Sequence, residues 1–361
     1  METISTKSIA KKKKFQFKDL PKVNFSHVNS LTDDTGIIQH AIFNIPNRKE
    51  GYCIDDNARA LLLSVLTYNN KNHKEELPLK TYLSFIHYMQ TENGEFKNFM
   101  SYTKAATEEK GSEDSFGRTL MALGYLMNGV HLKLLTQTAA GIFSKAYCHI
   151  DKLVSLRGIA NSIMGVCEFV KYNYPDDIKR DLVIKLADKM MNAYSTHKED
   201  GWNWFEPILT YDNAILPLAL LNAYEITSDE KYFTVAFETM EFLESKVFHG
   251  GVFSPIGNQG WCEQGKETFA RFDQQGIDAM AMVLFYKQAH RITSDEIYLS
   301  KMYTCYQWFL GNNDLKLPLY DSSTGGCADG LHIKEVNQNQ GAESTLAYWI
   351  SHMIVASELK P

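Results

Sequence analysis

Carboxylates stand at the start of nearly every long apolar segment in this sequence. In "GYCIDDNARALLLSVL", residues 51–66, two adjacent aspartates precede an apolar run of helical period. The acidic residues in such positions are Asp55, Asp56, Glu113, Asp114, Asp212, Asp273 and Glu343. Each one alone fits a helix cap, because an acid in the first turn accepts from free N–H groups and meets the positive end of the helix dipole, worth about 0.5–2 kcal/mol.

The recurrence of these acids points to chemistry as well as capping. Capping alone predicts a mixture of serine, threonine, asparagine and aspartate, whereas five of the six long apolar segments begin with acid. If these starts converge in space, their carboxylates repel one another and the pKa of at least one of them rises. A set of carboxyl groups with separated pKa values is suited to proton transfer.

Two loops that precede such starts carry tryptophan beside acid. The loop "EDGWNWFEPILTYDNA" (199–214) contains Trp202, Trp204 and Glu206, and the loop "GNQGWCEQGKETFARFDQQG" (257–276) contains Trp261. An indole ring beside carboxylates and amides suits the apolar face and the hydroxyl edge of a sugar ring. The alternative is that these tryptophans pack beneath their own loops.

A third loop is rich in glycine and amides. The stretch "STGGCADGLHIKEVNQNQGAES" (323–344) offers Asp329 and Gln340 as partners for sugar hydroxyls, and it lacks the strand-then-helix setting of a dinucleotide motif. His40 and His332 stand without ligand-spaced neighbours, so the sequence predicts neither a metal site nor a cofactor.

Two arginines follow acids at helical spacing. Arg59 lies four positions after Asp55, and Arg118 lies four positions after Asp114. The spacing predicts ion pairs within each helix that hold the carboxylates in place. Direct contact of both guanidinium groups with a substrate is the alternative interpretation.

The elements that position these residues form a repeat of about 40 to 70 residues. Six segments that are apolar on nearly every face, starting near residues 55, 113, 155, 211, 272 and 339, predict buried helices. One-faced amphipathic helices are predicted between them at 77–90, 134–153, 176–197, 231–248 and 295–312. The first amphipathic helix must come from about residues 30–43 or be replaced by irregular structure.

The lengths of the connections indicate that the two ends of this helical array differ. Links from a buried helix to the next amphipathic helix are short, whereas the links back, at about 91–112, 198–210, 249–271 and 313–338, are long. Long connections tend to be functional. The buried helices all start beside the long loops, so we expect a site on that face.

Composition bounds the remaining possibilities. The 361 residues are 44% hydrophobic and 12% aromatic with a net charge of −6, which disfavours nucleic acid as a partner. A basic cluster at residues 11–14 predicts a flexible basic tail over 1–25, followed by one domain over 26–361. The sequence shows no membrane span or signal peptide, and its six scattered cysteines favour a cytoplasmic protein.

The pattern of six buried helices with acidic starts resembles the all-α six-hairpin (α/α)6 toroid of many glycosidases and of N-acylglucosamine 2-epimerases. The stretches "TDDTGIIQHAIFNIPNRKEGYCIDDNARALL", "GSEDSFGR", "NWFEPILTYDNAILPLAL" and "NQGAESTLAYW" are similar to a bacterial domain found alone or fused to glycosyltransferases. The resemblance implies a role in glycan metabolism and a glycosyltransferase as a partner. Members of the epimerase branch use paired histidines at inner-helix starts, and this chain has none at the corresponding starts.

The leading hypothesis from the sequence is a glycoside hydrolase that works through two carboxyl groups on an oligosaccharide. Glu113 or Asp114 is the expected general acid and Asp212 or Asp273 the expected base, with inversion assumed by analogy. The residues expected to bind substrate are Asp55, Asp56, Arg59, Arg118, Trp202, Trp204, Glu206, Trp261, Asp329, Gln340 and Glu343. The alternatives are a non-catalytic module that presents glycans to a glycosyltransferase, and a sugar epimerase or isomerase.

Overall fold

A computed structural model describes residues 20–69, 77–172 and 177–358 of the chain. The basic cluster and most of the predicted N-terminal tail lie outside these residues. The helices of the described residues are α1 (Ser26–Leu31), α2 (Ile54–Asn69), α3 (Leu79–Met89), α4 (Glu113–Gly129), α5 (Lys133–Ile150), α6 (Leu156–Tyr172), α7 (Asp177–His197), α8 (Ile215–Thr227), α9 (Glu230–Val247), α10 (Gly276–Thr293), α11 (Ile297–Gln307), the 3₁₀ helix η1 (Trp308–Leu310) and α12 (Ala342–Glu358).

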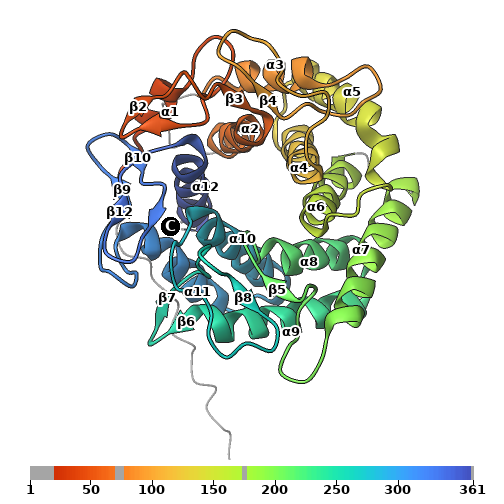
Figure 1. Cartoon of the computed structure of the whole chain (residues 1–361). Coiled ribbons are helices and arrows are strands. Elements are labelled where there is room, and N and C mark those ends of the chain that lie inside the picture. Colours follow the sequence, from red (N-terminus) through yellow and green to blue (C-terminus); the bar gives the residue numbers. More distant parts are fainter. Residues whose placement is uncertain (1–19, 70–76, 173–176, 359–361) are drawn as a thin grey trace, which may run out of the picture.

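The helices form two concentric rings, as Figure 1 shows. The even-numbered helices α2, α4, α6, α8, α10 and α12 make the inner ring, and the odd-numbered helices lie outside them. Burial follows the sequence pattern: every residue of α6 from Arg157 to Val170 is buried, whereas α7 buries only one face. The chain is therefore an all-α toroid of six helical hairpins, which confirms the predicted fold class.

The first hairpin departs from regularity. Its outer helix is only α1, six residues long, and most of the predicted 30–43 segment forms bends and isolated bridges, with one two-residue strand at Ala41–Ile42. Gly36 packs against the Asn57 side chain, and Asp33 caps the following turn by accepting from the backbone N–H of Thr35. These turn contacts and the β-branched residues that follow favour extended structure over a helix. The predicted 295–312 helix is also shorter and ends as η1.

Close helix packing in the inner ring depends on glycine. A Cβ atom on Gly117 would lie 2.3 Å from the carbonyl oxygen of Gly158, and one on Gly124 would lie 2.5 Å from that of Gly165. The two pairs are one heptad apart on α4 and α6, so the backbones of these helices touch at two successive levels. The small residues that mark the buried segments in the sequence serve this contact.

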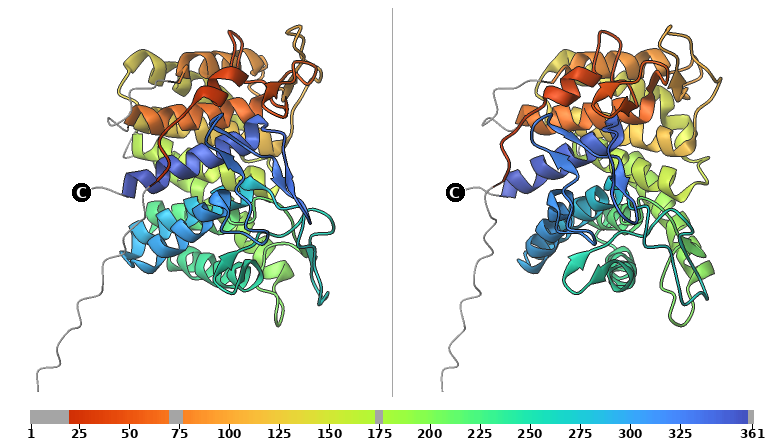
Figure 2. Two further views of the ribbon diagram at one scale, coloured as in Figure 1. Left: turned by 90° about the vertical axis from the view of Figure 1, so that its left-hand side faces the viewer. Right: turned by 60° about the vertical axis from the view of Figure 1, so that its left-hand side comes forward.

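The long loops gather at one end of the toroid, as the side views in Figure 2 show. Paired short strands fasten them: β1 (Ala41–Ile42) with β2 (Ile45–Pro46), β3 (Tyr52–Cys53) with β4 (Phe99–Met100), β5 (Ile208–Leu209) with β8 (Cys262–Glu263), β6 (Phe248–His249) with β7 (Val252–Phe253), β9 (Tyr320–Asp321) with β10 (Gly326–Cys327), and β11 (Gly330–Leu331) with β12 (Val336–Asn337). All six pairs are antiparallel. In the part of the chain that is described, no helix combines the length and the apolar character needed to cross a bilayer.

Candidate functional site

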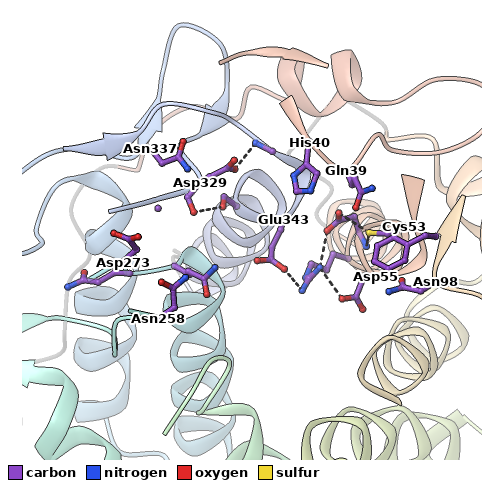
Figure 3. A pocket seen from close by; sticks show the side chains of 18 of the residues that line it. Gln39, His40, Cys53, Asp55, Asn98, Asn258, Asp273, Asp329, Asn337 and Glu343 are labelled. Carbon is purple, nitrogen blue, oxygen red and sulfur yellow. Dashed lines mark hydrogen bonds and ion pairs between the residues drawn. The ribbon is translucent and has the colours of Figure 1, made fainter. Parts of the chain in front are cut away.

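A pocket of about 370 Å³ opens at the loop end of the toroid, over the starts of α10, α12 and α2. We call it the mouth pocket. Figure 3 shows Asp329 and Asp273 on one side of it and Asp55 on the other, with Glu343 between them. Asp56, beside Asp55, completes the set of five acids in the lining. The predicted convergence of acidic helix starts is thus found for one half of the ring.

A cysteine shapes the start of α2. The Cys53 thiol accepts from the Asp56 backbone N–H and donates to Asp56 Oδ2 at 3.0 Å. Asn57 accepts from the backbone N–H of Ile37 at 3.1 Å and donates to the carbonyl of Cys53 at 2.8 Å. These bonds fix the segment that carries His40 against α2 and orient Asp56 at the edge of the mouth pocket.

Buried arginines join the carboxylates of several helices. Arg59 contacts Asp56 at 2.9 Å, Glu343 at 2.8 Å and Asp55 at 3.8 Å. Arg118 on α4 contacts Asp55 at 2.6 Å and Asp212 at 3.1 Å. The predicted i,i+4 pair is therefore present at Arg59, while Arg118 reaches across to α2 and not back to its own helix. A chain of alternating charges links the starts of α12, α2, α4 and α8.

These surroundings separate the pKa values of the carboxyl groups. Burial raises the pKa of Asp56 to about 6 despite the Arg59 guanidinium. Burial also raises the pKa of Asp329 to about 6. Burial opposes ionisation of Asp55 too, but Arg118 and Arg59 outweigh it and lower the pKa of that carboxyl. The mouth pocket therefore contains carboxyl groups that are shifted in opposite directions.

Asp273 forms a pair with His332 across the same pocket. Backbone hydrogen bonds between Gln274 and Leu331, at 3.0 and 2.9 Å, place their chain neighbours Asp273 and His332 side by side. His332 Nδ1 lies 2.5 Å from Asp273 Oδ1, and Gln259 donates to Asp273 Oδ2 at 2.9 Å. The carboxylate therefore fixes the orientation of the imidazole ring.

Asp329 is held by the segment that leads into α12. Its Oδ1 accepts from the backbone N–H of Gly341 at 2.7 Å, and its own backbone N–H donates to Asn339 at 2.8 Å. A Cβ atom on residue 341 would lie 2.9 Å from Asp329 Oδ1, so glycine lets the carboxyl approach the backbone. The glycine-rich stretch thus serves to position this acid.

Three of the four acids expected to be catalytic do not line the mouth pocket. Glu113 accepts from the backbone N–H groups of Val154 and Ser155 at 2.7 and 2.6 Å, and so caps the neighbouring helix α6. Asp114 accepts from the hydroxyls of Ser155 and Tyr211. Asp212 is buried against Arg118, and burial raises its pKa. Only Asp273 of the four reaches the pocket.

The loop tryptophans expected to bind sugar lie elsewhere. Trp204 is fully buried, and Trp202 is buried with its indole N–H donating to the carbonyl of Glu206 at 2.8 Å. The Glu206 carboxylate pairs with Arg157 at 3.0 Å. Trp261 is half-buried against Tyr211. None of these side chains lines the mouth pocket.

Gln340 also points away from the mouth pocket. Its amide donates to Asp321 at 3.1 Å and accepts from the Thr324 hydroxyl at 2.9 Å, and it lines a different cavity. The two histidines that the sequence left without a role, His40 and His332, do line the mouth pocket. In the sequence, each of these histidines lies in a loop segment close to aspartates. This proximity is the one feature that could have identified them, because neither has neighbours at the spacing of metal ligands. Among the described residues, no three His, Cys, Asp or Glu side chains are grouped to hold a metal ion.

Comparison with models of known protein families gave no match, and neither did comparison with curated protein sequences. Solved structures do match. A sugar epimerase from a ruminal bacterium is 14% identical, with a TM-score of 0.70 over 91% of this chain and 93% of that one. The protein therefore shares the (α/α)6 fold of this epimerase.

Hydrolases share this six-hairpin toroid as well. A GH76 α-mannanase from Bacteroides thetaiotaomicron is 12% identical, with a TM-score of 0.67 over 92% of this chain and 93% of that one. An inactive GH76 α-1,6-mannanase from Salegentibacter, with two consecutive aspartates replaced by asparagine, was solved with α-1,6-mannotriose. It is 12% identical, with a TM-score of 0.62 over 93% of this chain and 97% of that one.

Proposed function

We propose that the protein is a glycoside hydrolase that acts on an uncharged oligosaccharide in the mouth pocket. The observation that carries this proposal is that one pocket holds two carboxyl groups in different surroundings. Burial raises the pKa of Asp329 to about 6, whereas the Asp273 carboxylate accepts from Gln259 and lies beside His332. A carboxyl group whose raised pKa favours its protonated form and a second carboxylate that activates water are the two components of acid-base glycoside cleavage.

The roles follow from the surroundings of each acid. Asp329 is the general acid that protonates the leaving oxygen. Asp273, oriented by Gln259 and His332, is the base that activates water. Asp55 lines the same pocket with its Oδ2 paired to Arg118 at 2.6 Å, so it adds negative charge at the pocket edge and helps to position the substrate. The acid role moves here from Glu113 and Asp114, because both already bind the start of α6.

The charge of the mouth pocket favours an uncharged glycan. Five carboxyl groups face it, and the single arginine in the lining, Arg59, is already paired with Asp56 and Glu343. A sugar acid or a sugar phosphate would be repelled by this field. A mannose oligosaccharide, as in the complex of the mannanase relative, is compatible with it.

The test is a screen of neutral oligosaccharides, α-1,6-mannotriose included, with products identified by mass spectrometry. We expect shortened products from the parent protein. Asp329→Asn and Asp273→Asn should each lower kcat/KM by about 10²- to 10⁴-fold. Asp200→Asn, at an exposed position, is the matched control and should change nothing. Full turnover by both pocket variants would refute the assignment.

The raised pKa of Asp329 also predicts the pH profile. Activity that needs the protonated acid falls as pH rises through about 6, because the carboxyl group then loses its proton. The alkaline limb of kcat/KM measured from pH 4 to 8 reports this group. A profile that is flat between pH 5 and 7.5 would argue against Asp329 as the acid.

One observation favours a second function, sugar epimerisation or isomerisation. His40 and His332 both line the mouth pocket, although they come from loops and not from helix starts. Two imidazoles on opposite sides of a sugar could remove and return a proton at carbon. Deuterium uptake from solvent into a free sugar, lost in His332→Gln, would establish this activity. Binding without any turnover would instead support a module that presents glycans to a glycosyltransferase.

A further inference from the structure

A tight hairpin next to the mouth pocket presents an aromatic ring to solvent. Strands β1 and β2 are joined by Phe43 and Asn44, and Phe43 is 58% exposed. Its φ is 52°, in the left-handed region where a two-residue hairpin turn normally carries glycine. Phenylalanine is therefore energetically less favourable than glycine at this turn position. Burial of its ring does not offset this cost, because the ring is exposed.

The rest of the structure holds Phe43 in this conformation. Asn339 Oδ1 accepts from the Phe43 backbone N–H at 2.9 Å, and the Phe43 carbonyl accepts from the backbone N–H of Gln340 at 2.8 Å. The hairpin is thereby tied to the segment that leads into α12. Strained residues that their surroundings hold in place tend to occur at functional sites.

The ring lines a second cavity, of about 540 Å³, which we call the hairpin pocket. Its lining contains amide, hydroxyl and carboxylate groups from Asn44, Asp321, Ser322 and Gln338, and no lysine, arginine or histidine. The side chains of Asn44, Ser322 and Gln338 are exposed to solvent. An exposed ring beside exposed amides and a hydroxyl suits a sugar, and a lining without cationic side chains disfavours an anion.

The hairpin pocket shares a wall with the mouth pocket. Along the segment 336–341, Val336, Gln338 and Gln340 line the hairpin pocket, whereas Asn337 and Gly341 line the mouth pocket. The alternation follows the period of an extended strand, whose successive side chains point to opposite faces. The two cavities are therefore back to back across one strand of backbone.

We propose that the hairpin pocket is a second binding site for an uncharged oligosaccharide, with the Phe43 ring as its stacking surface and Asn44 and Gln338 as hydroxyl partners. The identity of the ligand as a glycan rests on the proposed function. The site retains a glycan chain on the outer side of the wall while another part of that chain, or another chain, is processed in the mouth pocket.

The test measures retention on an array of immobilised neutral oligosaccharides that includes α-1,6-linked mannose chains. Phe43→Gly removes the ring and gives the turn its preferred residue, so the variant should fold with an unchanged or higher Tm. Ile45→Ser is the matched control, since Ile45 is 65% exposed on the same hairpin but does not line the pocket. The measurements are made in the Asp329→Asn background, because a protein that does not cleave the glycan leaves the immobilised ligand intact.

We expect Asp329→Asn to retain glycans and the double variant with Phe43→Gly to bind them about fivefold more weakly or worse, as for an aromatic anchor. Ile45→Ser should bind as the parent does. Equal retention with and without Phe43, or no retention of any glycan, overturns the site. An equal loss caused by Ile45→Ser would show that the hairpin as a whole, and not the Phe43 ring, supports retention, and it would also overturn the site.

The two proposals fail separately. Cleavage of oligosaccharides with no effect of Phe43→Gly on retention would sustain the hydrolase and remove the second site. Glycans retained through Phe43 but recovered intact would sustain the second site and remove the hydrolase.

Discussion

Arg118, in the second turn of α4, donates to Asp55 at the start of α2 across 2.6 Å, although 63 residues separate them in the chain. The same guanidinium donates to Asp212 at 3.1 Å, and the Arg118 side chain is buried. One arginine thus neutralises a carboxylate at the edge of the mouth pocket and another beneath it. The ionised state of Asp55 depends on this contact.

Replacement of Arg118 by methionine should leave the buried Asp212 without its ion-pair partner and leave Asp55 with only the longer contact to Arg59, at 3.8 Å. We expect the free energy of unfolding to fall by about 3–5 kcal/mol in urea denaturation, as for a broken buried pair. Asp55→Asn in the same chain should restore part of the loss, because one of the uncompensated charges is then gone. Arg180→Met, at an exposed arginine of α7, should stay within about 0.5 kcal/mol of the parent. Equal losses for the two arginine variants would contradict the network.

Asp278, in the first turn of α10, should make stability fall as pH rises. Burial, followed by repulsion from Asp212, raises the pKa of Asp278 to about 8. Between the unfolded pKa near 4 and this value, the folded chain binds a proton that the unfolded chain does not, so raising the pH favours unfolding. Asp278→Asn should remove up to about 1.4 kcal/mol per pH unit of this slope.

Urea denaturation of parent and Asp278→Asn from pH 5 to 8 checks this expectation. The variant should gain stability relative to the parent as the pH rises. Asp200→Asn, at an exposed aspartate, controls for the loss of one carboxyl group and should follow the parent. Parallel lines for parent and Asp278→Asn would mean that Asp278 is ionised at neutral pH in the folded protein.

Gly124→Ala should strain the contact between α4 and α6. The added Cβ would lie 2.5 Å from a backbone oxygen of Gly165, which cannot move without shifting a helix. We expect a loss of about 1–3 kcal/mol in the free energy of unfolding. Gly141→Ala on the outer helix α5 is the matched control, because its Cβ would meet nothing within 4 Å, and it should gain about 0.5–1 kcal/mol. A neutral Gly124→Ala would show that the two helices can separate freely.

The rings of helices could be predicted because the pattern that defines them is local. Apolar periodicity, polar starts and long loops are properties of contiguous sequence, and they identified each inner helix and the face where the loops gather. The position of a loop side chain in the folded protein, in contrast, depends on contacts with segments that are distant in the sequence. Nothing near Asp273 in the sequence shows that His332 lies beside it, because a backbone pairing between distant loops brings them together.

The same limit applies to the acids. An acidic start was equally visible at Glu113 and at Asp55, yet one caps α6 and the other faces the mouth pocket. The difference is set by which neighbouring helix offers free N–H groups and which offers an open edge. Arg118 shows the same limit. Its i,i+4 spacing predicted a pair with Asp114, but in the structure its guanidinium group pairs with Asp55 and Asp212.

Trp202 and Trp204 provide a test that separates a packing role from a sugar-binding role, because only one of the two indole N–H groups donates a hydrogen bond among the described residues. Both pack near Phe242, but Trp202 donates its indole N–H to the carbonyl of Glu206, whereas the indole N–H of Trp204 has no partner in the described part of the chain. Trp202→Phe should therefore lower the free energy of unfolding by about 1 kcal/mol more than Trp204→Phe, in urea denaturation. Neither change should alter glycan retention on the array, since both rings are buried. A variant that loses glycan retention while keeping its stability would identify that tryptophan as a sugar-binding surface.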